Sequence, residues 1–161
     1  MAYKFYVTIE GSQQGIFSDG AISKASQGKL TGEGYQHEIR APIDTVSGMI
    51  TGKIQHQPIT FRHIWGESSP LLFRAMTMNE VLNKVMFEFI RPSERSGAEE
   101  VFYTVTLTNA HIVGIQYLSD QTTVPDAPPT ELISLGYESI DVESIPGKTL
   151  ASANWIVERH G

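Results

Sequence analysis

The sequence predicts a mainly β fold, an antiparallel β-barrel or sandwich with one short flanking α-helix, in a single domain that covers residues 1–161. Apolar and polar residues alternate along most of the chain, as in half-buried strands, while only one segment has helical spacing. Turns rich in glycine and proline separate seven candidate strands. No internal repeat or linker divides the chain, and its length is that of one ordinary domain.

The composition is that of an acidic globular protein without cysteine. The chain has 12 Lys and Arg residues against 18 Asp and Glu residues, a formal net charge of −6. This balance argues against a non-specific nucleic-acid binder, which needs positive charge to displace counterions from phosphate. No apolar run is long enough for a signal-peptide core or a membrane span. We therefore expect a chain that begins in the cytoplasm and does not insert into a membrane.

The first forty residues are predicted to hold two strands separated by a loop. Residues 3–9 alternate between apolar and more polar side chains, as in a half-buried strand. Residues 11–34 are polar, contain several glycines and show little periodicity, which predicts a loop. Alternation returns at residues 35–39 and ends before Pro42.

Residues 41–52 combine the composition of a loop with many apolar side chains. Proline, aspartate, serine and glycine recur in this segment, as in turns. Four large apolar residues lie between them: Ile43, Val46, Met49 and Ile50. A loop with this many apolar residues usually contacts something, so we expect it to lie against another surface.

Residues 53–64 predict another strand, with Ile59 and Phe61 on one face and Arg62 on the other. Pro58 lacks an amide hydrogen, so we expect an edge or a bulge at this part of the strand.

One segment predicts a helix. Residues 68–70 read Ser-Ser-Pro, which is typical of a serine N-cap followed by proline at the first helical position, where the missing amide hydrogen of proline costs nothing. Apolar residues then follow at helical spacing. The helix is predicted to run from about Ser69 to Asn79.

The second half of the chain is predicted to begin with two strands. Residues 85–90 alternate, and a turn separates them from the longest candidate, residues 101–117. Apolar residues hold one parity throughout this long segment, so Val113 and Tyr117 are predicted to face the same side as Val105.

The last third is predicted to be a loop followed by strands. The proline-rich residues 119–130 predict the loop. The strand that starts at Leu132 changes parity between Tyr137 and Ile140, which predicts a bulge. A final element is predicted over residues 149–157, with Trp155 in it.

The residues offer no strong catalytic constellation. Phosphate-binding, dinucleotide-binding and serine-hydrolase motifs are incomplete. His63 and His111 share the parity of core-facing residues, so a metal or acid–base pair across the sheet is one hypothesis. Amphipathic side chains at a barrel rim are the favoured alternative, because no carboxylate lies at a fixed ligand spacing. We therefore predict no enzyme, no cofactor and no metal site.

Several segments together resemble a known family. Gly52 and Lys53 precede a short strand, and Ser68, Pro70 and Leu72 form a Ser-x-Pro-x-Leu helix start. Residues 5–11 look like the first strand of the same family, and residues 99–109 like its long hairpin strand. By the order and spacing of these segments, which cover about residues 3–155, the sequence resembles the haemolysin-coregulated proteins (Hcp), the tube subunits of bacterial type VI secretion.

The resemblance implies a barrel like that of a phage tail tube. Such subunits form hexameric rings that stack into a hollow tube, which a contracting sheath expels and which can carry effectors in its lumen. The implied partners are further copies of the chain and the sheath, spike and effector proteins of the system. The implied location is the cytoplasm before firing, then secretion without a cleaved signal peptide.

The resemblance also assigns a role to the apolar loop at residues 41–52. It corresponds to a family excursion that reaches neighbouring subunits, so it is the candidate for contacts between subunits or rings. The candidate residues of this contact loop are Pro42, Ile43, Asp44, Val46, Ser47 and Met49.

An alternative function uses the mouth of the barrel instead. A β-barrel binding module or small enzyme would place its ligand there, with His63, His111 and Arg62 as site residues. The two hypotheses differ in whether these three side chains come together.

Overall fold

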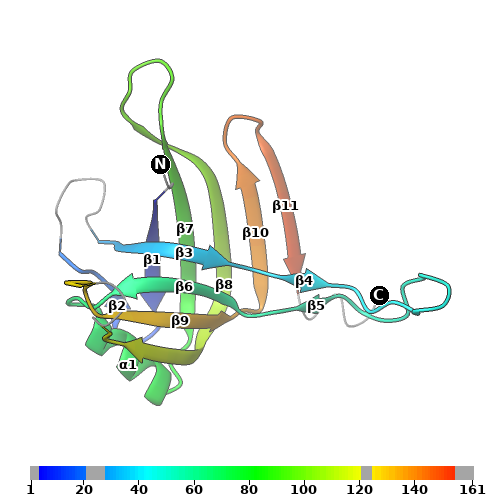
Figure 1. Cartoon of the computed structure of the whole chain (residues 1–161), viewed down its shortest axis with the longest axis horizontal. Helices are drawn as coiled ribbons and strands as arrows, with labels where there is room; N and C mark the ends of the chain where they lie inside the picture. Colours follow the sequence, from blue (N-terminus) through cyan, green and yellow to red (C-terminus); the bar gives the residue numbers. More distant parts are fainter. Residues whose placement is uncertain (1–3, 21–27, 121–124, 155–161) are drawn as a thin grey trace.

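The computed structural model describes residues 4–20, 28–120 and 125–154 (Figure 1). In these ranges the chain forms eleven β-strands and one α-helix. The elements of the first half are β1 (Phe5–Gly11), β2 (Gly15–Ile16), β3 (Leu30–Gln36), β4 (Ile39–Arg40), β5 (Gln55–His56), β6 (Ile59–Ile64) and α1 (Ser69–Thr77). Those of the second half are β7 (Leu82–Pro92), β8 (Glu99–Leu118), β9 (Thr130–Gly136), β10 (Ser139–Ser144) and β11 (Thr149–Asn154).

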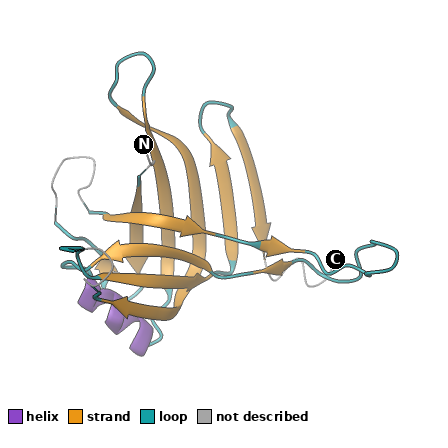
Figure 2. Cartoon of the chain, viewed as in Figure 1, coloured by secondary structure: helices purple, strands orange, loops and turns teal. Residues whose placement is uncertain are grey.

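The strands form a closed antiparallel barrel with two extensions. β8, β7, β1, β3, β6 and β9 pair in this order, and β9 also pairs with β8, which closes a six-stranded barrel. β10 and β11 continue the sheet from another part of β8, while β4 and β5 form a separate ribbon. The helix lies beside the barrel (Figure 2). The predicted fold class is confirmed. Among the described residues, no helix combines the length and apolarity needed to cross a membrane.

The core fills the barrel with the inward residues of its strands. An aromatic cluster occupies one part of it, with neighbouring ring centroids 5.0–6.4 Å apart. Edge-on and tilted contacts of this kind add to the free energy gained by removing the rings from water. The cluster consists of Phe5, Tyr35, Phe61, Phe87 and Phe89.

Gly32 makes room for the aromatic cluster. It pairs with Phe5 across β1 and β3. A Cβ atom at residue 32 would lie 2.3 Å from the Phe5 ring, well inside contact distance. The absence of a side chain at this position therefore lets the Phe5 ring lie over β3.

The predicted loop at residues 11–34 is wrong at both of its ends. β2 pairs with β1, the Phe17 side chain is fully buried, and β3 begins at Leu30. The alternation of apolar and polar residues is not visible in the sequence of β3, because Gly32 supplies no side chain on the inward face. Residues 21–27 lie outside the described part of the chain.

The predicted strand at residues 53–64 is two strands. β5 pairs with β4, whereas β6 pairs with β3 and β9. Pro58 lies in the interruption between them, and β6 is a barrel strand rather than an edge. Instead of the predicted edge or bulge, Pro58 lies at a break that separates two sheets.

The predicted single parity of residues 101–117 is wrong. Val105 and Leu107 point into the core, but beyond Asn109 the buried residues are Ala110 and Ile112. Asn109 has φ +50°, in the left-handed region that asparagine tolerates better than most residues. This residue shifts the alternation by one position, so Val113 faces outward. A second register shift between Ile112 and Gly114 restores the predicted parity, and Ile115 packs against the core while Tyr117 pairs with the buried Glu131.

The change of parity after Tyr137 marks a break between two strands rather than a bulge within one. β9 ends at Gly136 and pairs with the second half of β8, and β10 begins at Ser139 and pairs with the first half. The final element is β11, and the predicted continuation to residue 157, including Trp155, lies outside the described residues.

The helix has nearly the predicted bounds. Ser68 occupies the N-cap position and Pro70 lies in the first turn. The chain leaves the helix at Met78, and Asn79 has φ +52°, which a continuing helix does not permit. The Ser68 hydroxyl does not cap the helix. It donates to Asp19 instead.

We expect Gly32→Ala to destabilise the fold. The new methyl group meets the Phe5 ring, and overpacking of this kind lowers the free energy of unfolding by about 1–3 kcal/mol. Urea unfolding followed by fluorescence measures the change. Gly114→Ala is the matched control in another barrel strand, because its Cβ would lie at least 3.7 Å from its neighbours. Equal effects of the two substitutions would contradict the role given to Gly32.

Candidate assembly surfaces

The segment from β4 to β5, residues 39–56, projects from the barrel and is called the arm below (Figure 1). Its base is the antiparallel ladder in which Ile39 pairs with His56 and Arg40 with Gln55. An isolated bridge pairs Ile43 with Ile50 further out. The predicted contact loop is therefore the outer part of a two-stranded ribbon.

The arm ends in a turn organised by Asp44. Its carboxylate accepts hydrogen bonds from the Val46 amide, at 2.9 Å, and the Ser47 hydroxyl, at 3.0 Å. These bonds lower the pKa of Asp44. The Asp44 amide donates to the Met49 carbonyl, and Gly48, with φ +75°, donates to the Asp44 carbonyl. The tip thus has a defined conformation of its own.

The arm exposes most of its apolar side chains. Val46 is 93% exposed and Met49 67%, and Ile43 and Ile50 are also exposed. Pro42 is half-buried, and Asp44 and Ser47 are exposed. The arm thus brings the six predicted contact residues onto one projection, although a neighbouring subunit there stays a prediction.

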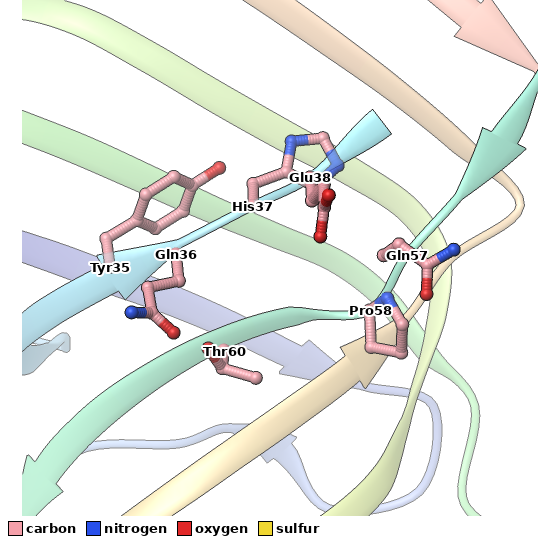
Figure 3. A pocket seen from close by; sticks show the side chains of 7 residues that line it. All are labelled: Tyr35, Gln36, His37, Glu38, Gln57, Pro58 and Thr60. Atoms are coloured by element: carbon pink, nitrogen blue, oxygen red, sulfur yellow. The ribbon is translucent and has the colours of Figure 1, made fainter. Parts of the chain in front are cut away.

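A polar pocket of about 750 Å³ lies at the root of the arm, where the chain passes between β3 and β4 and between β5 and β6. The Tyr137 hydroxyl lies 2.8 Å from His37 Nε2 and 3.0 Å from His56 Nδ1. Because one hydroxyl donates only once, at least one of the two rings must donate to it. Burial and the neighbouring His56 lower the pKa of His37. The lining residues are those in Figure 3: Tyr35, Gln36, His37, Glu38, Gln57, Pro58 and Thr60.

This polar root anchors the arm to the barrel. Among the described residues, no group of three or more His, Asp or Glu side chains could hold a metal ion. The Gln57 amide also donates to the Glu38 carbonyl at 3.1 Å, which ties the two strands of the arm together at the barrel.

The structure does not bring His63, His111 and Arg62 together. His63 is 2% exposed and points into the protein, and Arg62 faces solvent from the opposite side of β6. His111 is exposed because of the parity shift at Asn109. His63 pairs with Glu131 and His111 with Gly136, and these partners are roughly 16 Å apart along β9. The barrel-mouth site predicted from shared parity is therefore wrong.

His63 instead belongs to a buried charged cluster. Its Nε2 atom lies 2.5 Å from Asp19 Oδ2, and its Nδ1 atom lies 2.8 Å from Glu131 Oε1. Ser68 donates to Asp19 from its amide and hydroxyl, and the Ser69 hydroxyl donates to Glu131. The cluster ties the start of α1 to β6 and β9.

The two carboxylates keep His63 protonated at neutral pH. Burial alone would lower its pKa, but the hydrogen bonds to Asp19 and Glu131 prevail and raise it to about 9. Sequence reasoning missed the cluster because Asp19 comes from a segment predicted to be a loop, and Glu131 lies just before the strand predicted to start at Leu132. The inward parity of His63 was the signal that pointed to it.

A second apolar surface, called the helix groove below, is an open hollow of about 370 Å³ between α1 and the end of β8. Trp65 and Tyr117 meet edge to face with centroids 6.0 Å apart. The Trp65 indole also donates to the Thr130 carbonyl at 2.9 Å, which fixes its ring. The lining residues are Trp65, Gly66, Ser69, Pro70, Phe73 and Tyr117.

A family model described as type VI secretion system effector, Hcp, matches residues 6–143. The chain belongs to the Hcp family. A relative called Major exported protein, from Pseudomonas aeruginosa PAO1, is 35% identical in an alignment of 125 positions that covers 72% of each chain. This assignment confirms the resemblance carried by residues 5–11, 52–73 and 99–109.

Solved structures of Hcp proteins have the same fold. One described as the crystal structure of an Hcp protein has a TM-score of 0.88 and 26% identity, and covers 96% of this chain and all of its own. The secreted protein Hcp3 from Pseudomonas aeruginosa has a TM-score of 0.78 and 24% identity, covering 96% and 99% of the two chains.

Membership decides between the two hypotheses. Hcp proteins are structural, secreted components of the type VI secretion system and not enzymes. The prediction that this chain is not an enzyme is confirmed.

We expect alkaline pH to destabilise this Hcp protein through His63. Because its pKa is raised from 6.5 to about 9, the native state retains a proton that the unfolded chain has lost. The contribution, about 3 kcal/mol, is complete below pH 6.5 and disappears as the pH rises through about 9. Urea unfolding between these pH values measures it.

Two variants isolate this effect. His63→Gln removes the titrating ring, so we expect its stability to fall less over the same pH interval, whereas His111→Gln alters an exposed ring and keeps the full decrease. If His63→Gln does not fold, an NMR titration of the His63 ring in the unaltered protein provides the readout. A pKa near the ordinary histidine value would refute the charged cluster.

Proposed function

We propose that this protein is the subunit of the type VI secretion inner tube, and that it assembles head to tail into hexameric rings that stack into a hollow tube. Membership of the Hcp family identifies type VI secretion as the system to which the protein belongs. The observation that carries the proposal is the arm, because a protein that acts as a monomer rarely extends a ribbon of exposed aliphatic side chains.

The arm is suited to contact a neighbouring subunit. Its ladder and its Asp44 turn hold the tip in one shape, so little conformational freedom is lost on binding. Complete burial of an aliphatic side chain contributes about 1.5–3 kcal/mol. The proposed contact residues are Pro42, Ile43, Asp44, Val46, Ser47 and Met49.

The edge of the sheet offers a second contact. β11 pairs with β10 and ends the sheet within the described residues, and Leu150 on it is 66% exposed. An open strand edge can pair with another chain, and in a ring it would be covered by the next copy. A ring needs two different surfaces that fit each other, and the arm and this edge belong to different elements.

The remaining parts of the proposal concern export. The tube would be built in the cytoplasm, expelled without a cleaved signal peptide by the sheath together with the spike, and would carry effectors in its lumen. The chain has no cysteine, so passage from reducing to oxidising surroundings leaves no thiol to be oxidised.

We expect the purified protein to sediment as a particle of about six chains of 17.8 kDa each, and electron microscopy to show rings with a central hole.

Val46→Asp combined with Met49→Asp places charges in the proposed contact and should weaken assembly at least tenfold. The monomer should keep its urea midpoint, because both side chains are exposed.

Val81→Asp is the matched control for a charge on an exposed valine outside the arm, and it should assemble normally. A wild-type protein that remains a single chain at high concentration would refute the proposal. If the variant with both Asp substitutions forms rings as well as the wild type does, the arm is not a contact surface of the ring.

A further inference from the structure

The helix groove lies at the opposite end of the molecule from the arm. Along the longest axis the arm forms one end, and α1 lies beside the other end of the barrel (Figure 1). The arm of one chain therefore does not lie against the groove of the same chain. A second copy can bring the two surfaces together.

The groove is an apolar surface that its own chain leaves uncovered. Phe73 is 55% exposed, and Trp65 and Tyr117 are each 45% exposed. Tyr117 lies near the end of β8, where it pairs with Glu131 of β9, and its edge-to-face contact with Trp65 keeps the two rings in place. Exposed aromatic rings held rigidly in a concave surface are typical of binding sites for protein partners.

The arm and the groove are matched in chemistry. None of the groove-lining residues carries a formal charge. The arm tip exposes the apolar side chains of Val46 and Met49 beside polar ones, and the Asp44 carboxylate already accepts two hydrogen bonds within the turn. Contact between them would thus remove apolar surface from water on both sides without burying an unpaired charge.

We propose that the helix groove receives the arm of a neighbouring copy, with Val46 and Met49 against Phe73, Trp65 and Tyr117. This inference rests on the proposed ring and names the surface that accepts the arm. Contact between two unlike patches is heterologous, so each copy offers one arm and one groove, and repetition closes a ring instead of stopping at a dimer. Paired arms would instead give a two-fold dimer.

Cysteine crosslinking tests the contact directly, because the chain contains no cysteine of its own. Val46→Cys protein is mixed with Phe73→Cys protein, dissociated and reassembled, and treated with a short bismaleimide. We expect mixed dimers at least tenfold above those formed with Met78→Cys, the control at the far end of the same helix. A chain carrying both Val46→Cys and Phe73→Cys should give a ladder of covalent oligomers.

A second measurement does not depend on crosslinking geometry. Phe73→Ser should weaken assembly at least tenfold and leave the urea midpoint of the monomer unchanged, while Met78→Ser should affect neither. These two variants compare exposed apolar side chains of one helix, inside and outside the groove.

The outcomes separate this inference from the proposed function. If rings form but Phe73→Cys crosslinks no better than Met78→Cys and Phe73→Ser assembles normally, the groove does not receive the arm, although the tube function stands. If the wild-type protein does not assemble at all, both proposals fail. Crosslinks between two Val46→Cys chains in place of mixed products would also overturn the arm-to-groove contact.

Discussion

The closed barrel depends on a change of partner half-way along β8. The first half of this strand pairs with β10 and the second half with β9, while β7 lies along its other edge. Asn109 lies between the halves, and its positive φ shifts the inward alternation from Val105 and Leu107 to Ala110 and Ile112. Without this shift one of the two halves would turn its apolar residues away from the core.

The same discontinuity also anchors the arm. Tyr137 lies in the break between β9 and β10, and the Glu138 amide beside it donates to the Thr108 carbonyl of β8 at 3.2 Å. From this buried position the Tyr137 hydroxyl reaches His37 and His56, one on each side of the arm. The point at which the sheet changes partner thus holds the root of the ribbon.

Local patterns predict much of this fold, and long-range pairings account for what they miss. Alternation locates β1 and β7, and Ser68 and Pro70 locate the start of α1. The apolar content of residues 41–52 singles out the arm without any structure. The alternation pattern does not predict the beginning of β3, because the inward position 32 is a glycine and the Phe5 ring of β1 fills the space beside it. The parity shift in β8 depends on which strands lie beside it. The cluster of His63, Asp19 and Glu131 joins three distant segments, and no spacing between them predicts it.

Net charge and apolar surfaces have complementary roles in the proposed assembly. A charge of −6 on every copy makes indiscriminate association unfavourable, since like-charged chains repel one another. The groove lining carries no formal charge, and the Asp44 carboxylate at the arm tip accepts two hydrogen bonds within its own turn, so the apolar side chains of the two surfaces can pack together while this ion keeps its hydrogen bonds. Repulsion between whole chains then disfavours contacts that bury little surface. A contact that overcomes this repulsion needs both shape complementarity and burial of apolar surface. A rigid arm and a fixed aromatic groove meet that requirement in one relative orientation, which is the property that a repeating ring needs.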